Sequence, residues 1–241
     1  MDDITVRFLP GLEERELRAS ILIEGLPGIG YVGKLVAEHM IEELGAEKIA
    51  EIHAVYFPPQ VIIGDDGTIR LANNELYYYP RDGDGILFLV GDHQSGTHEG
   101  HYHLADRYLE IAAEFHVQRI YTLGGFGVGH LVEEPRVLAA VNHPELRPDV
   151  EAAGAVFNRG EPGGGIVGAA GLLLGLGLTR GMDGICLMGE TSGYLVDPMS
   201  AASLLRVLSG LLGIEVDPTR LHQRGAEMEQ VIQHLIEGER V

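Results

Sequence analysis

Residues 21–34 read Ile21-Leu22-Ile23-Glu24-Gly25-Leu26-Pro27-Gly28-Ile29-Gly30-Tyr31-Val32-Gly33-Lys34, and the other expected elements are organised around them. The apolar start predicts a strand and the glycines predict a turn. From Val32 onward, apolar residues recur at the three-and-four spacing of a helix with one buried side. Glycines at the carboxyl end of a strand let the backbone approach a ligand or another backbone, and the amides of the following helix can bind an anion. The stretch therefore predicts a strand, turn and helix that could hold a functional site.

The glycines of this turn fit most of a dinucleotide-binding pattern. Gly28, Gly30 and Gly33 spell G-x-G-x-x-G, which also requires an acidic residue at the end of the next strand to hold the ribose. The next expected strand, residues 52–57, runs into Pro58-Pro59-Gln60 and supplies no acid there. A structural turn that packs the helix on the strand is the favoured interpretation, and nucleotide binding stays open as the alternative.

A second phosphate-binding pattern, the P-loop, also fits in part. Residues 28–34 spell G-x-x-x-x-G-K, but the apolar Leu35 replaces the hydroxyl residue that should bind magnesium. Because that metal ligand is lost, we expect Lys34 to be a solvated residue of the first helical turn. We expect the protein to use no cofactor.

Length and charge bound the other interpretations. The 241 residues suit one α/β domain over residues 1–241. The net charge of −19 argues against the basic face that nucleic-acid binding requires. No apolar run is long enough to span a membrane, and the acidic start Met1-Asp2-Asp3 shows no secretory signal. We therefore expect a cytoplasmic protein that binds neither nucleic acid nor membranes.

The order of the expected strands and helices indicates an α/β fold. Short β-rich runs over residues 49–79, separated by turn residues, predict antiparallel hairpins. Continuous apolar runs at 86–90, 119–123 and 183–188 predict strands buried on both faces. Helices are expected over residues 101–116, 166–178, 198–212 and 218–236. The alternation predicts a mostly parallel central sheet flanked by helices, with an antiparallel hairpin excursion.

Two intervening stretches are less regular. Prolines interrupt the polar stretch 133–149, which predicts short helical turns. Residues 154–157 predict a further strand, and Gly163-Gly164-Gly165 is expected to open the helix that follows.

Glycines and polar residues gather where the buried strands are expected to end. In open α/β sheets, ligands bind outside the carboxyl ends of the strands. The candidate ligand-binding residues are therefore Gly28, Gly30, Gly33, Asp92, Gln94, Gly125, Glu190 and Thr191. Asp92 and Glu190 could form a carboxylate pair for acid/base chemistry, an alternative that the sequence leaves open.

The histidines and the cysteine predict no further chemistry. His93, His98, His101 and His103 are crowded together, but their spacing is not H-E-x-x-H, and a glycine-rich helix start gives little rigidity for a zinc site. Cys186 lies in an apolar run, where a small buried side chain is the favoured interpretation over a nucleophile. We therefore predict no metal and no catalytic residue.

Several segments in a fixed order resemble the proteasome assembly chaperone 2 (PAC2) family. The likeness covers about residues 18–221 and lies in the order of the motifs rather than in any one of them. The motifs are Gly25-Leu26-Pro27-Gly28-Ile29-Gly30, Gly91-Asp92-His93-Gln94, Leu123-Gly124-Gly125, Gly165-Ile166-Val167-Gly168-Ala169-Ala170-Gly171-Leu172-Leu173-Leu174, Leu187-Met188-Gly189-Glu190-Thr191 and Val196-Asp197-Pro198. The chain is identified as an archaeal-type member, a kind sometimes labelled ATP-grasp.

This resemblance implies a fold similar to nucleoside phosphorylases, homo-oligomers of three to five subunits and, in some members, a role in assembling the α-ring of the 20S proteasome. We therefore expect a non-enzymatic assembly or interaction protein whose partners are its own copies and proteasome α subunits. The alternative is a nucleotide- or small-molecule-binding enzyme, phosphorylase-like or ligase-like, that uses the glycine-rich turns, because a fold alone does not carry a function.

The carboxyl end departs from the family pattern. Members that engage the α-ring tend to end in a hydrophobic residue, a tyrosine and one final residue, whereas this chain ends Gly238-Glu239-Arg240-Val241. Contact through another surface, or a divergent function, therefore stays open. We expect the subunits to associate through the glycine-rich loops and the late apolar helices at 166–178 and 204–212, since a helix that is apolar all round must be buried on all sides.

Overall fold

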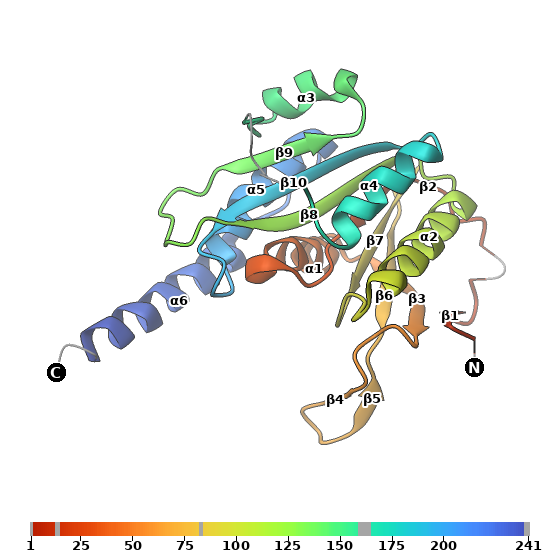
Figure 1. Ribbon diagram of the computed structural model, residues 1–241, viewed down its shortest axis with the longest axis horizontal. Coiled ribbons are helices and arrows are strands. Elements are labelled where there is room, and N and C mark those ends of the chain that lie inside the picture. Colours follow the sequence, from red (N-terminus) through yellow and green to blue (C-terminus); the bar gives the residue numbers. More distant parts are fainter. Residues whose placement is uncertain (1, 13–14, 82–83, 159–164, 239–241) are drawn as a thin grey trace.

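An eight-stranded mixed sheet runs through the centre of the structure, a computed structural model that describes residues 2–12, 15–81, 84–158 and 165–238 (Figure 1). Its strands, in sheet order, are β1 (Ile4–Phe8), β3 (Glu47–Ala54), β6 (Asn74–Tyr79), β7 (Gly85–Gly91), β2 (Ala19–Glu24), β8 (Arg119–Gly127), β10 (Asp183–Thr191) and β9 (Val137–Val141). The central strands β7, β2, β8 and β10 are parallel, and the strands outside them pair antiparallel. The predicted α/β class, with an antiparallel excursion, is confirmed.

Helices cover both faces of this sheet because its central strands are apolar on both sides. α2 (His98–Glu114) and α4 (Ala169–Thr179) pack on one face, and α1 (Val32–Leu44) and α5 (Pro198–Leu212) pack on the other. Along β2, Leu22 belongs to the core under α2 and α4, whereas Ile23 belongs to the core under α1 and α5. The apolar helix α5 is covered within the chain by α1, the sheet and α6 (Thr219–Gly238).

Two elements leave this layered body (Figure 1). β4 (Val61–Ile63) and β5 (Ile69–Leu71) form a separate two-stranded sheet that projects as a hairpin arm. Helix α6 runs away from the body toward the carboxyl end of the chain. The short elements are η1 (Ile29–Tyr31), η2 (Pro144–Leu146) and α3 (Arg147–Ala152). Each helix in the described ranges is too short or too polar to cross a bilayer.

Strand β9 is an element that the sequence prediction missed. Residues 133–149 are predicted as helical turns, and η2 and α3 are such turns, but residues 137–141 form a strand paired with β10. Residues 137–141 form a strand because they pair with β10, and the local sequence pattern does not show this pairing. The strand predicted at 154–157 is wrong, because this segment makes a single bridge from Val156 to Leu138.

Several boundaries also differ from the prediction. The strand expected to reach Phe57 ends at Ala54, because the chain turns there and Phe57 N–H donates to the Ala54 carbonyl. The helix expected from residue 166 begins at Ala169. Gly163 and Gly164, and the tail residues 239–241, lie outside the described part of the chain.

Candidate functional site

The predicted site residues lie at the carboxyl edge of the sheet, beyond the ends of the four parallel strands β7, β2, β8 and β10. Register pairs Gly189 with Gly125 and Glu190 with Phe126, so the ends of β8 and β10 are level. The turn after β2 leads through η1 into α1, which crosses behind β8. The structure therefore brings the glycines of the turn and Gly125 together, as the sequence suggested.

These glycines allow backbone to pack on backbone. A Cβ atom at Gly33 would overlap the carbonyl oxygen of Leu123 in β8, and one at Gly25 would lie 2.5 Å from the Cβ of Ala37 in α1. A Cβ atom at Gly125 would overlap the carbonyl oxygen of Ile29. Neighbouring backbone thus fills the space beside Gly33 and Gly125 where a phosphate cradle would have to open.

Two residues of the turn have left-handed backbone. Gly30 has φ of 62°, and a Cβ atom there would lie 2.9 Å from Thr191 Oγ1. Tyr31 has φ of 53°, a conformation that few residues other than glycine adopt. Gly28 is different, because the nearest atom to an added Cβ is 4.0 Å away. The turn is therefore tightly packed at Gly30 and open at Gly28.

Lys34 is not solvated, contrary to the expectation from the sequence. Its Nζ donates a hydrogen bond of 2.8 Å to the carbonyl oxygen of Gly91 and lies 3.5 Å from a carboxylate oxygen of Glu38. The side chain thereby ties the first turn of α1 to the end of β7. This contact occupies the ammonium group that a P-loop would direct at a phosphate.

Asp92 is held by an arginine from the hairpin arm. Arg70 donates to both carboxylate oxygens, at 2.5 and 2.8 Å, and the backbone N–H of Asn73 donates to one of them at 3.0 Å. Burial alone would raise the pKa of Asp92, but these donors hold it below its ordinary value. Asp92 therefore anchors the arm as an ionised carboxylate.

Gln94 bridges two segments that are distant in sequence. Its Nε2 donates to the carbonyl oxygen of Pro27 at 2.8 Å, and its Oε1 accepts from the backbone N–H of Ala169 at 3.0 Å. The amide thus connects the turn after β2 to the amino end of α4. Both ends of this side chain are engaged within the protein.

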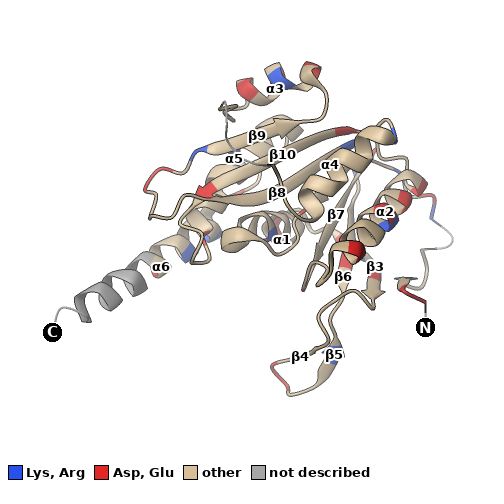
Figure 2. Ribbon diagram, viewed as in Figure 1, with Lys and Arg blue, Asp and Glu red and all other residues tan. Residues whose placement is uncertain are grey.

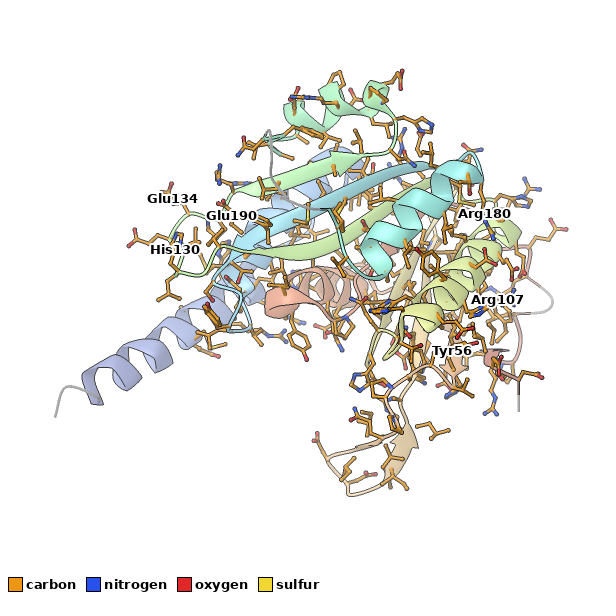
Figure 3. All side chains as sticks on the ribbon, in the orientation of Figure 1. Tyr56, Arg107, His130, Glu134, Arg180 and Glu190 are labelled. Atoms are coloured by element: carbon orange, nitrogen blue, oxygen red, sulfur yellow. The ribbon has the colours of Figure 1, made fainter. Side chains whose placement is uncertain are left out.

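Glu190 is paired with an arginine from the loop that follows β8. Arg136 donates to it from Nε at 3.0 Å and from its backbone N–H at 3.1 Å. These bonds hold the pKa of Glu190 below its ordinary value, and His130, beside it in Figure 3, acts in the same direction. β7 and β10 are three strand spacings apart, about 14 Å. The carboxylate pair with Asp92 that the sequence left open therefore does not form.

His93, His103 and Cys186 are engaged in packing or in contacts within the protein. In the described residues, no three His, Cys, Asp or Glu side chains converge to hold a metal. The ring of His103 stacks on Tyr56 with centroids 5.4 Å apart, and His93 bonds to Gln60. Burial raises the pKa of Cys186 to about 12, so its thiol stays protonated.

The sequence prediction missed a buried acid, Glu24, at the end of β2. Its side chain is 1% exposed, and its Oε1 accepts from the backbone N–H of Leu26 at 3.0 Å. Thr122, its register neighbour in β8, is also fully buried. Burial raises the pKa of Glu24 to about 8, so the group is mostly protonated at neutral pH. The signal in the sequence was a carboxylate next to an apolar strand.

Apolar side chains cover the outside of this edge. They come from the turn after β2 and from the loop after β10, and we call Ile29, Tyr31, Tyr194, Leu195 and Val196 the loop patch. The backbone N–H of Asp197 donates to the carbonyl oxygen of Gly30 at 2.9 Å and joins the two loops. Tyr194 is 80% exposed. Exposed apolar groups around a closed turn suit contact with another protein better than capture of a small polar molecule.

This chain is similar in sequence and in structure to proteins of one family. The PAC2 family model matches residues 22–236. The uncharacterised protein MJ1210 of Methanocaldococcus jannaschii is 43% identical over 219 residues, 91% of this chain and 84% of that protein. The crystal structure of Pyrococcus furiosus PbaB, described as an archaeal proteasome activator, is 40% identical with a TM-score of 0.90 and covers 98% of this chain and 99% of that one.

A second Pyrococcus furiosus structure shows how far the fold is shared. PbaA, described as an archaeal homolog of proteasome-assembly chaperone, superposes with a TM-score of 0.80 at 23% identity, over 99% of this chain and 94% of that one. At this identity the likeness shows the fold alone. The family model matches residues 22–236, and MJ1210 and PbaB are at least 40% identical over most of this chain. The chain therefore belongs to the PAC2 family.

Proposed function

We propose that this protein is a homo-oligomeric assembly protein of the proteasome-chaperone type, with three to five subunits, that contacts proteasome α subunits through the loop patch. The observation that carries the proposal is the similarity to the proteasome activator PbaB, at 40% identity over 98% of this chain. Sequence identity at this level, maintained from end to end, favours a shared class of partner.

The geometry of the carboxyl edge supports a protein partner. Backbone contacts close the turn at Gly33 and Gly125, and Lys34 is bound to Gly91. Asp92 and Glu190 are each neutralised by an arginine. What this edge presents outward is the apolar loop patch. Aromatic side chains such as its two tyrosines are enriched at the centres of protein interfaces.

Ligand binding by the strand-end residues stays a prediction. Thermal unfolding with a panel of nucleotides and phosphate compounds tests it, since a ligand at a hundred times its dissociation constant stabilises by about 2.7 kcal/mol. Stabilisation by a nucleotide would favour the enzyme alternative, which uses the same turns.

A binding experiment with charge introduced into the loop patch tests the proposal. Tyr31→Asp suits the left-handed backbone, because Asp tolerates this conformation, and Tyr194→Glu adds a second charge at an exposed position. Leu178→Glu, at an exposed leucine of α4, is the matched control. Binding is measured against immobilised recombinant proteasome α subunits and against the assembled 20S particle.

We expect the wild type and Leu178→Glu to bind alike and the double variant to bind at least about tenfold more weakly, with equal melting temperatures for all three. Failure of the wild type to bind either target would contradict the proteasome proposal. Undiminished binding by the double variant would remove the loop patch as the contact.

A further inference from the structure

The hairpin arm has two chemically different faces. Successive residues of a strand point to opposite sides, so cross-strand register decides which side chains share a face. Val61 pairs with Leu71 and Ile63 pairs with Ile69, which places four aliphatic side chains on one face. The other face carries the pair of Ile62 and Arg70. We call Val61, Ile63, Ile69 and Leu71 the aliphatic face.

The arm is fixed so that the aliphatic face points away from the body. On the opposite face, Arg70 is bound to both oxygens of Asp92 and lies 3.3 Å from Asn73 Oδ1. The tip is closed by Asp66, which accepts from the backbone and hydroxyl of Thr68 at 3.0 and 2.7 Å. The aliphatic side chains remain 45% exposed at Val61, 70% at Ile63, 68% at Ile69 and 56% at Leu71.

An exposed aliphatic face of this kind favours contact with another protein surface. An isolated two-stranded hairpin is at best marginally stable in water, and open apolar strand edges promote association with other chains. The aliphatic face also continues into a groove of about 520 Å³ at the base of the arm, which is lined by Val55, Phe57, Pro58 and Pro59 along with Val61 and Leu71. Arm and groove together form one mainly apolar surface, in which His53 and Gln60 are the polar residues of the groove lining.

The exposed area of the chain is large enough for a stable interface. The chain exposes 12777 Å². A compact monomer of 26.1 kDa exposes about 10,600 Å², so the excess is about 2,200 Å². A standard interface buries about 800 Å² on each partner. The arm and α6 are the two elements that leave the body, and this extended shape gives the chain more exposed surface than a compact monomer (Figure 1).

We propose that the aliphatic face and the groove beside it are the surface through which copies of this chain associate. The inference rests on the self-association proposed above and identifies the surface. The sequence prediction placed this surface in the glycine-rich loops and the late helices. Helix α5 is already covered within the chain. The arm is the better candidate because its apolar face lies outside the layered body.

Charge favours a second copy as the occupant. Each copy carries −19, so copies can approach closely only where acidic residues are absent. Figure 2 shows that the arm bears acidic residues at its tip but not along β4 and β5. Interfaces between identical subunits are also more apolar than those with transient partners. The groove lies beside the aliphatic face, so the face of one copy can enter the groove of the next. Such a head-to-tail contact closes into a ring when the rotation between subunits allows it.

Sedimentation velocity at micromolar concentration and physiological salt tests the proposal. The variant is Ile63→Glu/Ile69→Glu, which places charge in the aliphatic face, and Leu178→Glu is the control. We expect the wild type and control to sediment as the same multiple of 26.1 kDa and the double variant as a monomer, with its dissociation constant raised at least about a hundredfold. A monomeric wild type, or a double variant that keeps the oligomer mass, would overturn the inference.

A second measurement does not depend on the folding of that variant. Ile63→Cys adds an accessible thiol to a chain whose Cys186 is buried, and Leu178→Cys is its control. We expect maleimide to label the thiol introduced at position 63 at least about tenfold more slowly in the oligomer than after dilution, with no change at position 178. Equal rates at position 63 would contradict the contact. A wild type that forms the oligomer but binds neither proteasome target refutes only the proposed function and leaves this contact standing.

Discussion

Replacing Glu24 with glutamine is expected to favour the folded state increasingly, relative to wild type, as the pH rises from about 5.5 to about 8.5. Glu24 has a folded pKa of about 8 and an unfolded pKa near 4.5. Between these values the folded state binds more protons than the unfolded state, so the free energy of unfolding falls as the pH rises. The stabilisation from the bound proton is fully present below the unfolded pKa and is lost by the time the pH passes the folded pKa.

The magnitude follows from the window between the two pKa values. Each pH unit inside it changes the free energy of unfolding by about 1.4 kcal/mol, so wild type should lose about 3 kcal/mol between pH 5.5 and 8.5 through Glu24 alone. The group is 1% exposed, so solvent does not screen this effect. The glutamine introduced by Glu24→Gln cannot ionise, and its side-chain oxygen can still accept from the backbone N–H of Leu26, as Glu24 Oε1 does at 3.0 Å.

Urea unfolding followed by far-ultraviolet circular dichroism measures this effect at a fixed protein concentration. The difference between variant and wild type is compared at the two pH values, so contributions from all other titrating groups cancel. We expect the difference to shift in favour of the variant by about 3 kcal/mol from pH 5.5 to 8.5. A difference that stays constant within about 0.5 kcal/mol would refute a protonated, buried Glu24.

Two further predictions concern the turn. Gly33→Ala should lower the free energy of unfolding by about 3 kcal/mol, because its Cβ would overlap the Leu123 carbonyl. Gly175→Ala in α4 has open space around it and should raise the free energy of unfolding by about 0.5 to 1 kcal/mol. Thermal melts of the two variants check both expectations, and equal effects would contradict close packing at Gly33. Lys34→Met should lower the free energy of unfolding by about 1 to 2 kcal/mol, because the 2.8 Å hydrogen bond to the Gly91 carbonyl is lost. Urea unfolding measures this change, and a negligible change would mean that this lysine is solvated.

The layered fold could be predicted because its signals are local. The glycine turn between β2 and α1 and the unbroken apolar runs of β7, β8 and β10 each specify their own element. Strand β9 could not be predicted, because residues 137–141 suit a helix as well as a strand and only pairing with β10 decides between them. The order of the strands depends in the same way on contacts between distant segments.

The site could be predicted in position but not in its contacts. Strand ends indicate that Gly33, Gly125 and Glu190 share one edge, and they do. The glycine spacing shows that something approaches closely, but not that this is the backbone of β8 rather than a phosphate. Arg70 and Arg136 come from the hairpin arm and from a loop, and nothing local in the sequence assigns them to Asp92 and Glu190.

Native mass spectrometry of this protein mixed with recombinant proteasome α subunits shows whether the two associate, which the proposed function requires. We expect a complex whose mass equals a whole number of α subunits plus a whole number of 26.1 kDa chains, and we expect it to be lost with the Tyr31→Asp/Tyr194→Glu variant. Spectra that contain only the separate components, at concentrations where this chain is folded and the α subunits are competent to form rings, would contradict the claim.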